Sequence, residues 1–270
     1  MDLRCEALDS PVWRAWLVPD EAGHVALGGP GLAALEDLLL RARAEPRCRA
    51  LVLASDAGEF CRGMDLPGVT APHEPGAAVD AGESAGAAIA QFARCLGLLR
   101  ALPAATLCVV EGSVSGGGVG LVAACDVVIA TRAASFVLPE LLLGLIPAVV
   151  MPVIAERIGA ARTRWLALAG ETLAVDDAHR VGLVDERSDD PSLTVAARLK
   201  RLLRASPAAV ARLKQHAAEI AGLPLTDALA AGVARTTADV HDPDVRAAIA
   251  GFLSGELPPW FDRYRPGGGE

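Results

Sequence analysis

The sequence predicts an α/β fold, on three observations. Short apolar runs have the length of buried strands: 49–55, 105–112 and 126–131. Longer stretches with apolar residues at helical spacing stand between or before them: 29–46 and 81–101. Glycine-containing turns follow two of the strands, within 59–66 and 113–120. Strands that alternate with helices along a chain are typical of parallel sheets covered by helices.

The first predicted unit is a strand, a helix and a second strand. Residues 24–28 are predicted to be a short strand, and 29–46 a helix with Leu32, Leu35 and Leu39 on one face. The strand at 49–55 follows. A strand, helix and strand in this order imply parallel strands joined by a right-handed crossover.

The later elements repeat this alternation and then become helical. A helix at 81–101 runs up to Pro103, a strand follows, and the glycines after it open another helix. Residues 173–186 predict a helix, a glycine stop and a short strand, and 191–254 predict three or four amphipathic helices. We therefore expect a core domain over residues 1–190 and a helical C-terminal module over residues 191–270.

Composition excludes several classes of partner. The 270 residues carry a formal net charge of -8 with a pI near 5.2, which opposes binding to nucleic acid or to an anionic membrane. No apolar stretch is long enough to span a bilayer, and the N-terminus does not resemble a signal peptide. The cysteines show no metal-ligand spacing, so we expect buried thiols in a cytoplasmic protein: Cys5, Cys48, Cys61, Cys95, Cys108 and Cys125.

The stretch SVSGGGVGLVAACD, residues 113–126, places consecutive glycines at a predicted helix start. Glycine there lets a ligand approach the backbone, where the first N–H groups point outward at the positive end of the helix dipole. No lysine follows the glycines, so this is not a P-loop. Gly118, Gly120 and Ala123 match the dinucleotide pattern G-x-G-x-x-A, but the match falls late in the chain, so nucleotide binding is a weak alternative.

A second turn changes the interpretation of the first. The stretch FCRGMDL, residues 60–66, also follows a buried strand and also has a glycine at a bend. Backbone N–H groups from two such turns can converge on one oxygen atom, which is the arrangement of an oxyanion hole. A purely structural role for the glycines is the simpler alternative.

Four segments, in this order, resemble the signature blocks of the crotonase, or enoyl-CoA hydratase/isomerase, superfamily: FCRGMDL, EGSVSGGGVGLVAACDVVIAT, ASFVLPELLLGLIP and LAVDDAHRVGLVDE. The resemblance covers about residues 20–255. It implies repeated ββα turns that form two nearly perpendicular sheets, with a helical C-terminal trimerisation region. It further implies an acyl thioester ligand, no metal or organic cofactor, and a homotrimer or dimer of trimers.

The resemblance also assigns site residues. The backbone N–H groups of Met64 and Gly117 are expected to hold the thioester oxygen as it becomes an enolate. Five further residues are expected to contact the substrate: Arg62, Gly63, Asp65, Gly116 and Gly120. For Asp65, capping of its own turn is the simpler reading.

Glu140 is the expected catalytic acid and base. Hydratases of the family usually carry two glutamates, and this chain has Gly120 at the first of these positions and Glu140 at the second. A thioester α-proton needs a base as well as enolate stabilisation. The apolar neighbours Leu138 and Leu141 should raise the pKa of the Glu140 carboxyl. A helix cap after Pro139 is the alternative role.

The loss of one carboxylate argues against an ordinary water-adding hydratase. The segment 111–159 most resembles the polyketide β-branching dehydratases, which remove water from a 3-hydroxy-3-methylglutaryl group on an acyl carrier protein. The sequence therefore predicts that reaction, with the carrier protein as partner. A CoA-linked enoyl hydratase or isomerase, and a catalytically silent thioester-binding protein, are the alternatives. Basic residues within 200–219 form either a solvated face or a contact for the carrier.

Overall fold

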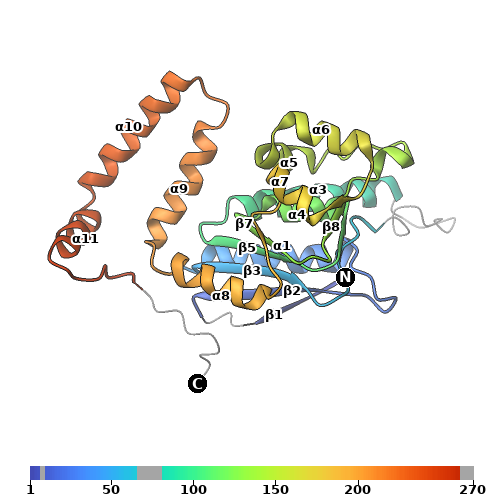
Figure 1. Ribbon diagram of the computed structural model, residues 1–270, viewed down its shortest axis with the longest axis horizontal. Coiled ribbons are helices and arrows are strands. Elements are labelled where there is room, and N and C mark those ends of the chain that lie inside the picture. Colours follow the sequence, from blue (N-terminus) through green and yellow to red (C-terminus); the bar gives the residue numbers. More distant parts are fainter. Residues whose placement is uncertain (7–9, 66–80, 262–270) are drawn as a thin grey trace. The chain divides into compact units, whose positions relative to one another are not determined.

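The computed structural model describes residues 1–6, 10–65 and 81–261 (Figure 1). The chain divides into two compact units, Met1–Val195 and Ala196–Glu270. The stretch 67–80, whose proline, glycine and alanine content predicts a loop, lies outside the described residues.

The larger sheet of the first unit has the strand order β1-β2-β3-β5-β7-β10. Its strands are β1 (Asp2–Glu6), β2 (Val12–Val18), β3 (Ala50–Ser55), β5 (Ala105–Val110), β7 (Val127–Ala130) and β10 (Glu186–Arg187). β1 pairs with β2 in antiparallel orientation, and all the other pairs are parallel. Every residue of β5 is buried, because a central strand of a parallel sheet is covered on both faces.

The smaller sheet carries the two glycine turns. Its strands, in the order β4-β6-β8-β9, are β4 (Glu59–Cys61), β6 (Ser113–Ser115), β8 (Ser135–Val137) and β9 (Leu173–Ala174). β4, β6 and β8 are parallel, so their carboxyl ends lie at the same edge of the sheet. The segments that follow these three strands are therefore brought together.

Helices cover both sheets of the first unit. They are α1 (Gly29–Ala44), α3 (Ala81–Arg100), α4 (Gly117–Ala124), the short 3-10 helix η1 (Glu140–Leu143), α5 (Met151–Ile158), α6 (Ala160–Ala169) and α7 (Val175–Val181). α1 packs on α3, and α4 packs on α5. Every residue of α4 is buried, so its glycines are in the interior. Figure 1 shows α5, α6 and α7 gathered together, away from the edge strand β1.

The C-terminal residues are helical. α8 (Pro191–Leu202) crosses the boundary between the units, and α9 (Pro207–Ile220), α10 (Leu225–His241) and α11 (Pro243–Leu253) follow. Arg212 of α9 pairs with Asp239 at 3.0 Å and with Asp242 at 3.5 Å. Arg212, one of the basic residues considered for carrier contact, is thus paired with acidic residues of this unit.

Most predicted elements are confirmed. The strands at 49–55, 105–112 and 126–131 are β3, β5 and β7, and the long helices are α1 and α3. The six cysteines are free thiols, and all except Cys5 are buried. Within the described ranges, no helix has both the length and the apolar character needed to cross a membrane.

The predicted strand at 24–28 is wrong. Its residues form only an isolated bridge, between Leu27 and Met64, and the parallel neighbour of β3 is β2. Val25 and Leu27 are fully buried, which explains the apolar pattern that suggested a strand. Their backbone groups bond to the turn after β4 rather than to the larger sheet: the N–H of Arg62 donates to Val25 O at 2.8 Å.

Candidate active site

The first turn presents the amide of Met64. The N–H of Leu27 donates to Gly63 O at 2.7 Å, and the N–H of Asp65 donates to Leu27 O at 3.0 Å. This parallel bridge uses groups of the residues on either side of Met64, so the N–H of Met64 itself points away from Leu27. Gly63 has φ +90°, which favours glycine and bends the chain at this point.

The second turn presents the amide of Gly117. Gly116 follows β6 with φ +52°, and Gly117 is the first residue of α4. An N–H group in the first turn of a helix has no acceptor within the helix, and no side chain caps this one. The helix dipole adds partial positive charge at the same place. The amide of Gly117 is therefore suited to hold an oxygen that gains negative charge.

The two turns are in direct contact because neither has a side chain there. A methyl group on Gly63 would lie 3.0 Å from Ser115 O and 3.1 Å from the backbone N of Gly117. A methyl group on Gly118 would lie only 2.7 Å from Cys61 O. The amide of Gly117 thus lies beside the residue that precedes Met64. This is the arrangement in which two main-chain donors can share one oxygen.

Glu140 lies against the same turns. It is the first residue of η1, and its Oε1 lies 3.0 Å from the place that a methyl group on Gly116 would occupy. Its Oε2 is buried and, within the described part of the chain, has no hydrogen-bond partner. Burial raises the pKa of the Glu140 carboxyl above its ordinary value. The site therefore places a carboxyl group that can both take and give a proton beside the two amides.

A cavity of about 340 Å³ joins these groups. Its polar side chains are Arg62, Ser115 and Glu140, and the rest of its wall is mainly apolar. The apolar residues come from α3 and from the segment around η1 and α5: Ile89, Phe92, Pro139, Leu143, Leu145, Ile146, Pro147, Ala148, Val149 and Val150. An apolar cavity with few polar groups is the usual form of a small-molecule site.

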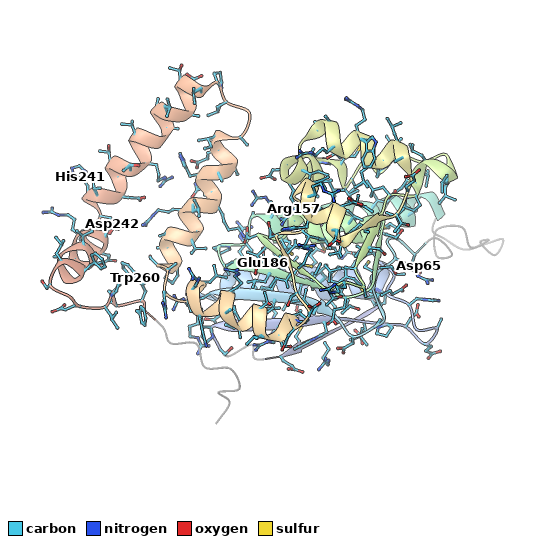
Figure 2. All side chains as sticks on the ribbon, viewed as in Figure 1. Asp65, Arg157, Glu186, His241, Asp242 and Trp260 are labelled. Carbon is cyan, nitrogen blue, oxygen red and sulfur yellow. The ribbon has the colours of Figure 1, made fainter. Side chains whose placement is uncertain are left out.

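Most of the predicted site residues line this cavity: Arg62, Gly63, Met64, Gly116, Gly117 and Glu140. Two do not. Asp65 lies against Gly28 and lines a neighbouring cavity, and Figure 2 shows it at the periphery of the first unit. Gly120 is buried in α4, where it packs against Val150 and Leu96.

The apolar wall of this cavity has no local signature in the sequence. Phe92 lies against the start of α4, where a methyl group on Gly117 would be 3.4 Å from its ring. Val150 stands in the segment GLIPAVV, whose apolar character is visible in the sequence. Which of these residues faces the site depends on how α3 and α5 pack on α4, and a single sequence does not contain that information.

A larger cavity of about 640 Å³ lies elsewhere in the first unit. Its wall is strongly charged and includes Arg132, Asp176, Arg187 and Asp189. The two arginines pair with the two aspartates, Arg132 with Asp189 at 2.7 Å and Arg187 with Asp176 at 2.5 Å. Neither glycine turn contributes to this cavity, so the smaller, apolar one is the candidate active site.

Comparison with known proteins agrees with this geometry. The family model described as enoyl-CoA hydratase/isomerase matches residues 26–263. The bacillaene synthase dehydratase PksH of Bacillus subtilis is 31% identical over 161 residues, which cover 60% of this chain and 62% of that protein. The match thus spans less than two thirds of the length of PksH. A probable enoyl-CoA hydratase of Rhodobacter capsulatus is 31% identical over 231 residues, which cover 81% of this chain and 83% of that protein.

Solved structures share the fold. An enoyl-CoA hydratase from Shewanella pealeana superposes with a TM-score of 0.86 at 24% identity, over 96% of each chain. Pseudomonas aeruginosa AtuE superposes with a TM-score of 0.83 at 27% identity, over 97% of this chain and all of that one. The two sheets described above are thus those of the crotonase fold. The chain belongs to the enoyl-CoA hydratase/isomerase family, a family of enzymes.

Proposed function

We propose that this enzyme removes water from a 3-hydroxy-3-methylglutaryl-type acyl thioester on an acyl carrier protein, in polyketide β-branching. The product is the α,β-unsaturated, 3-methylglutaconyl-type thioester. One observation supports the proposal: Glu140, whose Oε2 is buried, lines the same mainly apolar cavity as Met64 and Gly117. The similarity to PksH, a bacillaene synthase dehydratase, supports the choice of reaction.

The amides of Met64 and Gly117 hold the thioester carbonyl oxygen. When the C2–H bond breaks, the proton passes to a carboxylate oxygen of Glu140 and the electron pair forms an enolate. The enolate oxygen is stabilised because its two donors are fixed in place before the reaction begins. No side chain has to reorganise as the charge develops.

Glu140 then completes the elimination. The enolate electrons form the C2=C3 double bond as the C3–O bond breaks, and Glu140 returns its proton to the departing hydroxyl group, which leaves as water. The raised pKa of Glu140 suits both halves of this cycle. Because Glu140 both removes the proton from C2 and protonates the hydroxyl group on C3, the proton and the hydroxyl group leave from the same face of the substrate.

Arg62 is proposed to hold the distal carboxylate of the acyl group. Among the described residues that line the cavity it is the only cation, and its side chain is 43% exposed. Its Nε lies 3.3 Å from Glu59 Oε1, which leaves its terminal nitrogens for a ligand. Only four bonds separate C1 from the carboxylate carbon of a glutaryl chain, whereas the phosphate of the pantetheine arm is many bonds away. Arg62 therefore fits the acyl carboxylate better than that phosphate.

Two partners are part of the proposal. An acidic carrier protein would contact basic residues near the start of the C-terminal unit, such as Lys200 and Arg201, because this chain as a whole has a net negative charge. Self-association into a homotrimer, or a dimer of trimers, would cover apolar side chains that the C-terminal helices expose: Leu229, Val233, Ile249 and Phe252. Light scattering of the purified protein tests the second point.

A CoA-linked hydratase is the second candidate, because a relative that matches most of this chain is named a probable enoyl-CoA hydratase. One assay separates the candidates. The same 3-hydroxy-3-methylglutaryl group is presented on carrier protein and on CoA, and loss of water is followed by mass spectrometry. We expect the carrier-bound substrate to be dehydrated with the higher kcat/KM, and Glu140→Gln to lower turnover of both substrates by at least about 100-fold. Faster turnover on CoA would replace the carrier proposal, and turnover by Glu140→Gln at the wild-type rate would refute the mechanism.

A further inference from the structure

Gly120 leaves a space beside α4, one turn after the amide of Gly117. Gly117 and Gly120 are three residues apart, so they lie on the same face of the helix. This face packs on α3, because added methyl groups on Gly117 and Gly120 would meet Phe92 and Leu96, respectively. Glycine leaves that space to another residue.

Val150 fills the space. A methyl group on Gly120 would lie 2.4 Å from Val150 Cγ1 and 2.9 Å from its Cβ, with Leu96 Cδ1 at 3.6 Å. Val150 is only 3% exposed, and it also lines the cavity that holds Glu140. One isopropyl group thus packs on α4 and forms part of the cavity wall.

The wall is held firmly. The N–H of Val150 donates to Pro147 O at 3.2 Å, and the N–H of Ile154 donates to Val150 O at 3.1 Å. At the far end of α5, Arg157 donates to Cys125 O at 2.7 Å and to Leu183 O at 2.9 Å. Figure 2 labels Arg157 within the first unit. Because α5 is anchored at both ends, Val150 cannot retreat easily from a substrate of the wrong shape.

We infer that Val150 is a specificity-determining residue, which selects acyl groups that carry an alkyl branch at C3. The inference rests on the proposed function. The two amides fix C1, and Glu140 occupies the side of the cavity beside Gly116 from which the proton and the hydroxyl group leave. With the carboxymethyl group held at Arg62, the methyl group is the remaining substituent at C3, and it faces Val150. A methyl branch at C3 packs against the Val150 side chain, whereas a hydrogen atom at C3 leaves a void beside it.

A matched pair of substrates measures the selection. The 3-hydroxy-3-methylglutaryl and 3-hydroxyglutaryl groups, on the same carrier protein, differ by one methyl group. A methyl group in an apolar pocket changes kcat/KM by roughly 10- to 200-fold, so wild type should prefer the branched substrate by at least about tenfold. Val150→Ala should reduce the preference to about threefold or less, because the pocket no longer fits the branch closely.

Two further variants complete the test. Val150→Thr keeps the shape of the side chain and adds a hydroxyl group, so it should lower turnover of the branched substrate without opening the core. Val153→Ala makes the same truncation one turn along α5, at a residue that does not line the active-site cavity, and should keep the wild-type preference. Equal turnover of both substrates by wild type, or an unchanged preference in Val150→Ala, would overturn the role of Val150 and leave the proposed function in place. Dehydration of neither substrate would overturn both.

Discussion

Replacing Gly63 by alanine should disable the proposed oxyanion hole without removing either of its donors. The added methyl group would lie 3.0 Å from Ser115 O and 3.1 Å from the N of Gly117. Both are main-chain atoms of the second turn, so neither can swing aside as a flexible side chain would. The two turns must therefore separate by a few tenths of an ångström, and the amides of Met64 and Gly117 cease to converge on one oxygen.

The size of the effect follows from two contributions. Loss of one donor from an oxyanion hole lowers kcat by about 100- to 1000-fold, and we expect Gly63→Ala to reach at least the lower figure. Alanine at φ +90° adds backbone strain of about 1–2 kcal/mol, and overpacking adds about 1–3 kcal/mol. The free energy of unfolding should fall by roughly the sum of these two terms.

Gly182→Ala is the matched control. Gly182 ends α7 with φ +88°, and nothing lies within 4 Å of an added methyl group. This variant therefore has the same backbone strain without the crowding, and it should lose about 1–2 kcal/mol of stability while its kcat stays at the wild-type value. Urea unfolding measures the stability of both variants. The kcat values are measured without urea, at a temperature at which both variants are folded.

Two outcomes with Gly63→Ala and Gly182→Ala would contradict a catalytic role for the contact between the turns. If Gly63→Ala turned over substrate as fast as Gly182→Ala, the contact between the two turns would have no part in catalysis. A loss of kcat in both variants would show that general destabilisation, rather than the position of the Gly117 amide, controls the rate.

Three further predictions follow from the site and its support. Glu140→Gln should lower kcat by about 100- to 10,000-fold while calorimetry shows unchanged binding of the unsaturated product, and weaker binding would contradict a purely chemical role. Because burial raises the pKa of Glu140, kcat/KM should rise with pH through that raised pKa. The fold favours the protonated form of Glu140. Its contribution to the free energy of unfolding is therefore complete below the unfolded-state pKa and is lost as pH rises through the folded-state pKa. In urea unfolding, Glu140→Gln should be as stable as wild type at about pH 4 and more stable than wild type at about pH 8. Asp126→Ala removes the acceptor for the N–H of Thr106 at 2.8 Å and its hydroxyl at 2.9 Å, and should cost about 1–3 kcal/mol with little change in KM.

The long elements were predictable because their patterns repeat. α1 buries Leu32, Leu35 and Leu39 at the spacing that predicted it, and the apolar run of β5 is long enough to identify a central strand. The strands of the smaller sheet have two or three residues each, which is too short for a period to show. The segment at 24–28 failed for a related reason: burial of Val25 and Leu27 came from the turn after β4, not from a sheet.

The candidate site was predictable where it depends on local chemistry. Glycines a few residues beyond the buried strands β3 and β5 indicated both turns, and an acid between apolar residues indicated the raised pKa of Glu140. Asp65 and Gly120 follow the same motifs but face other parts of the molecule. The contact of Gly120 with Val150 arises only when α4 packs on α5, so no local pattern reveals it.

The bridge to Leu27 leaves the main-chain N–H of Met64 as a donor, and this limits what mutagenesis can test. Because the two proposed oxyanion donors at this site belong to the main chain, every amino acid except proline supplies them equally well. Side-chain scanning at residues 64 and 117 would therefore report on packing alone and leave the electrostatics of the reaction unmeasured. Replacing either peptide bond by an ester, which removes the N–H and keeps the shape, would expose its contribution directly.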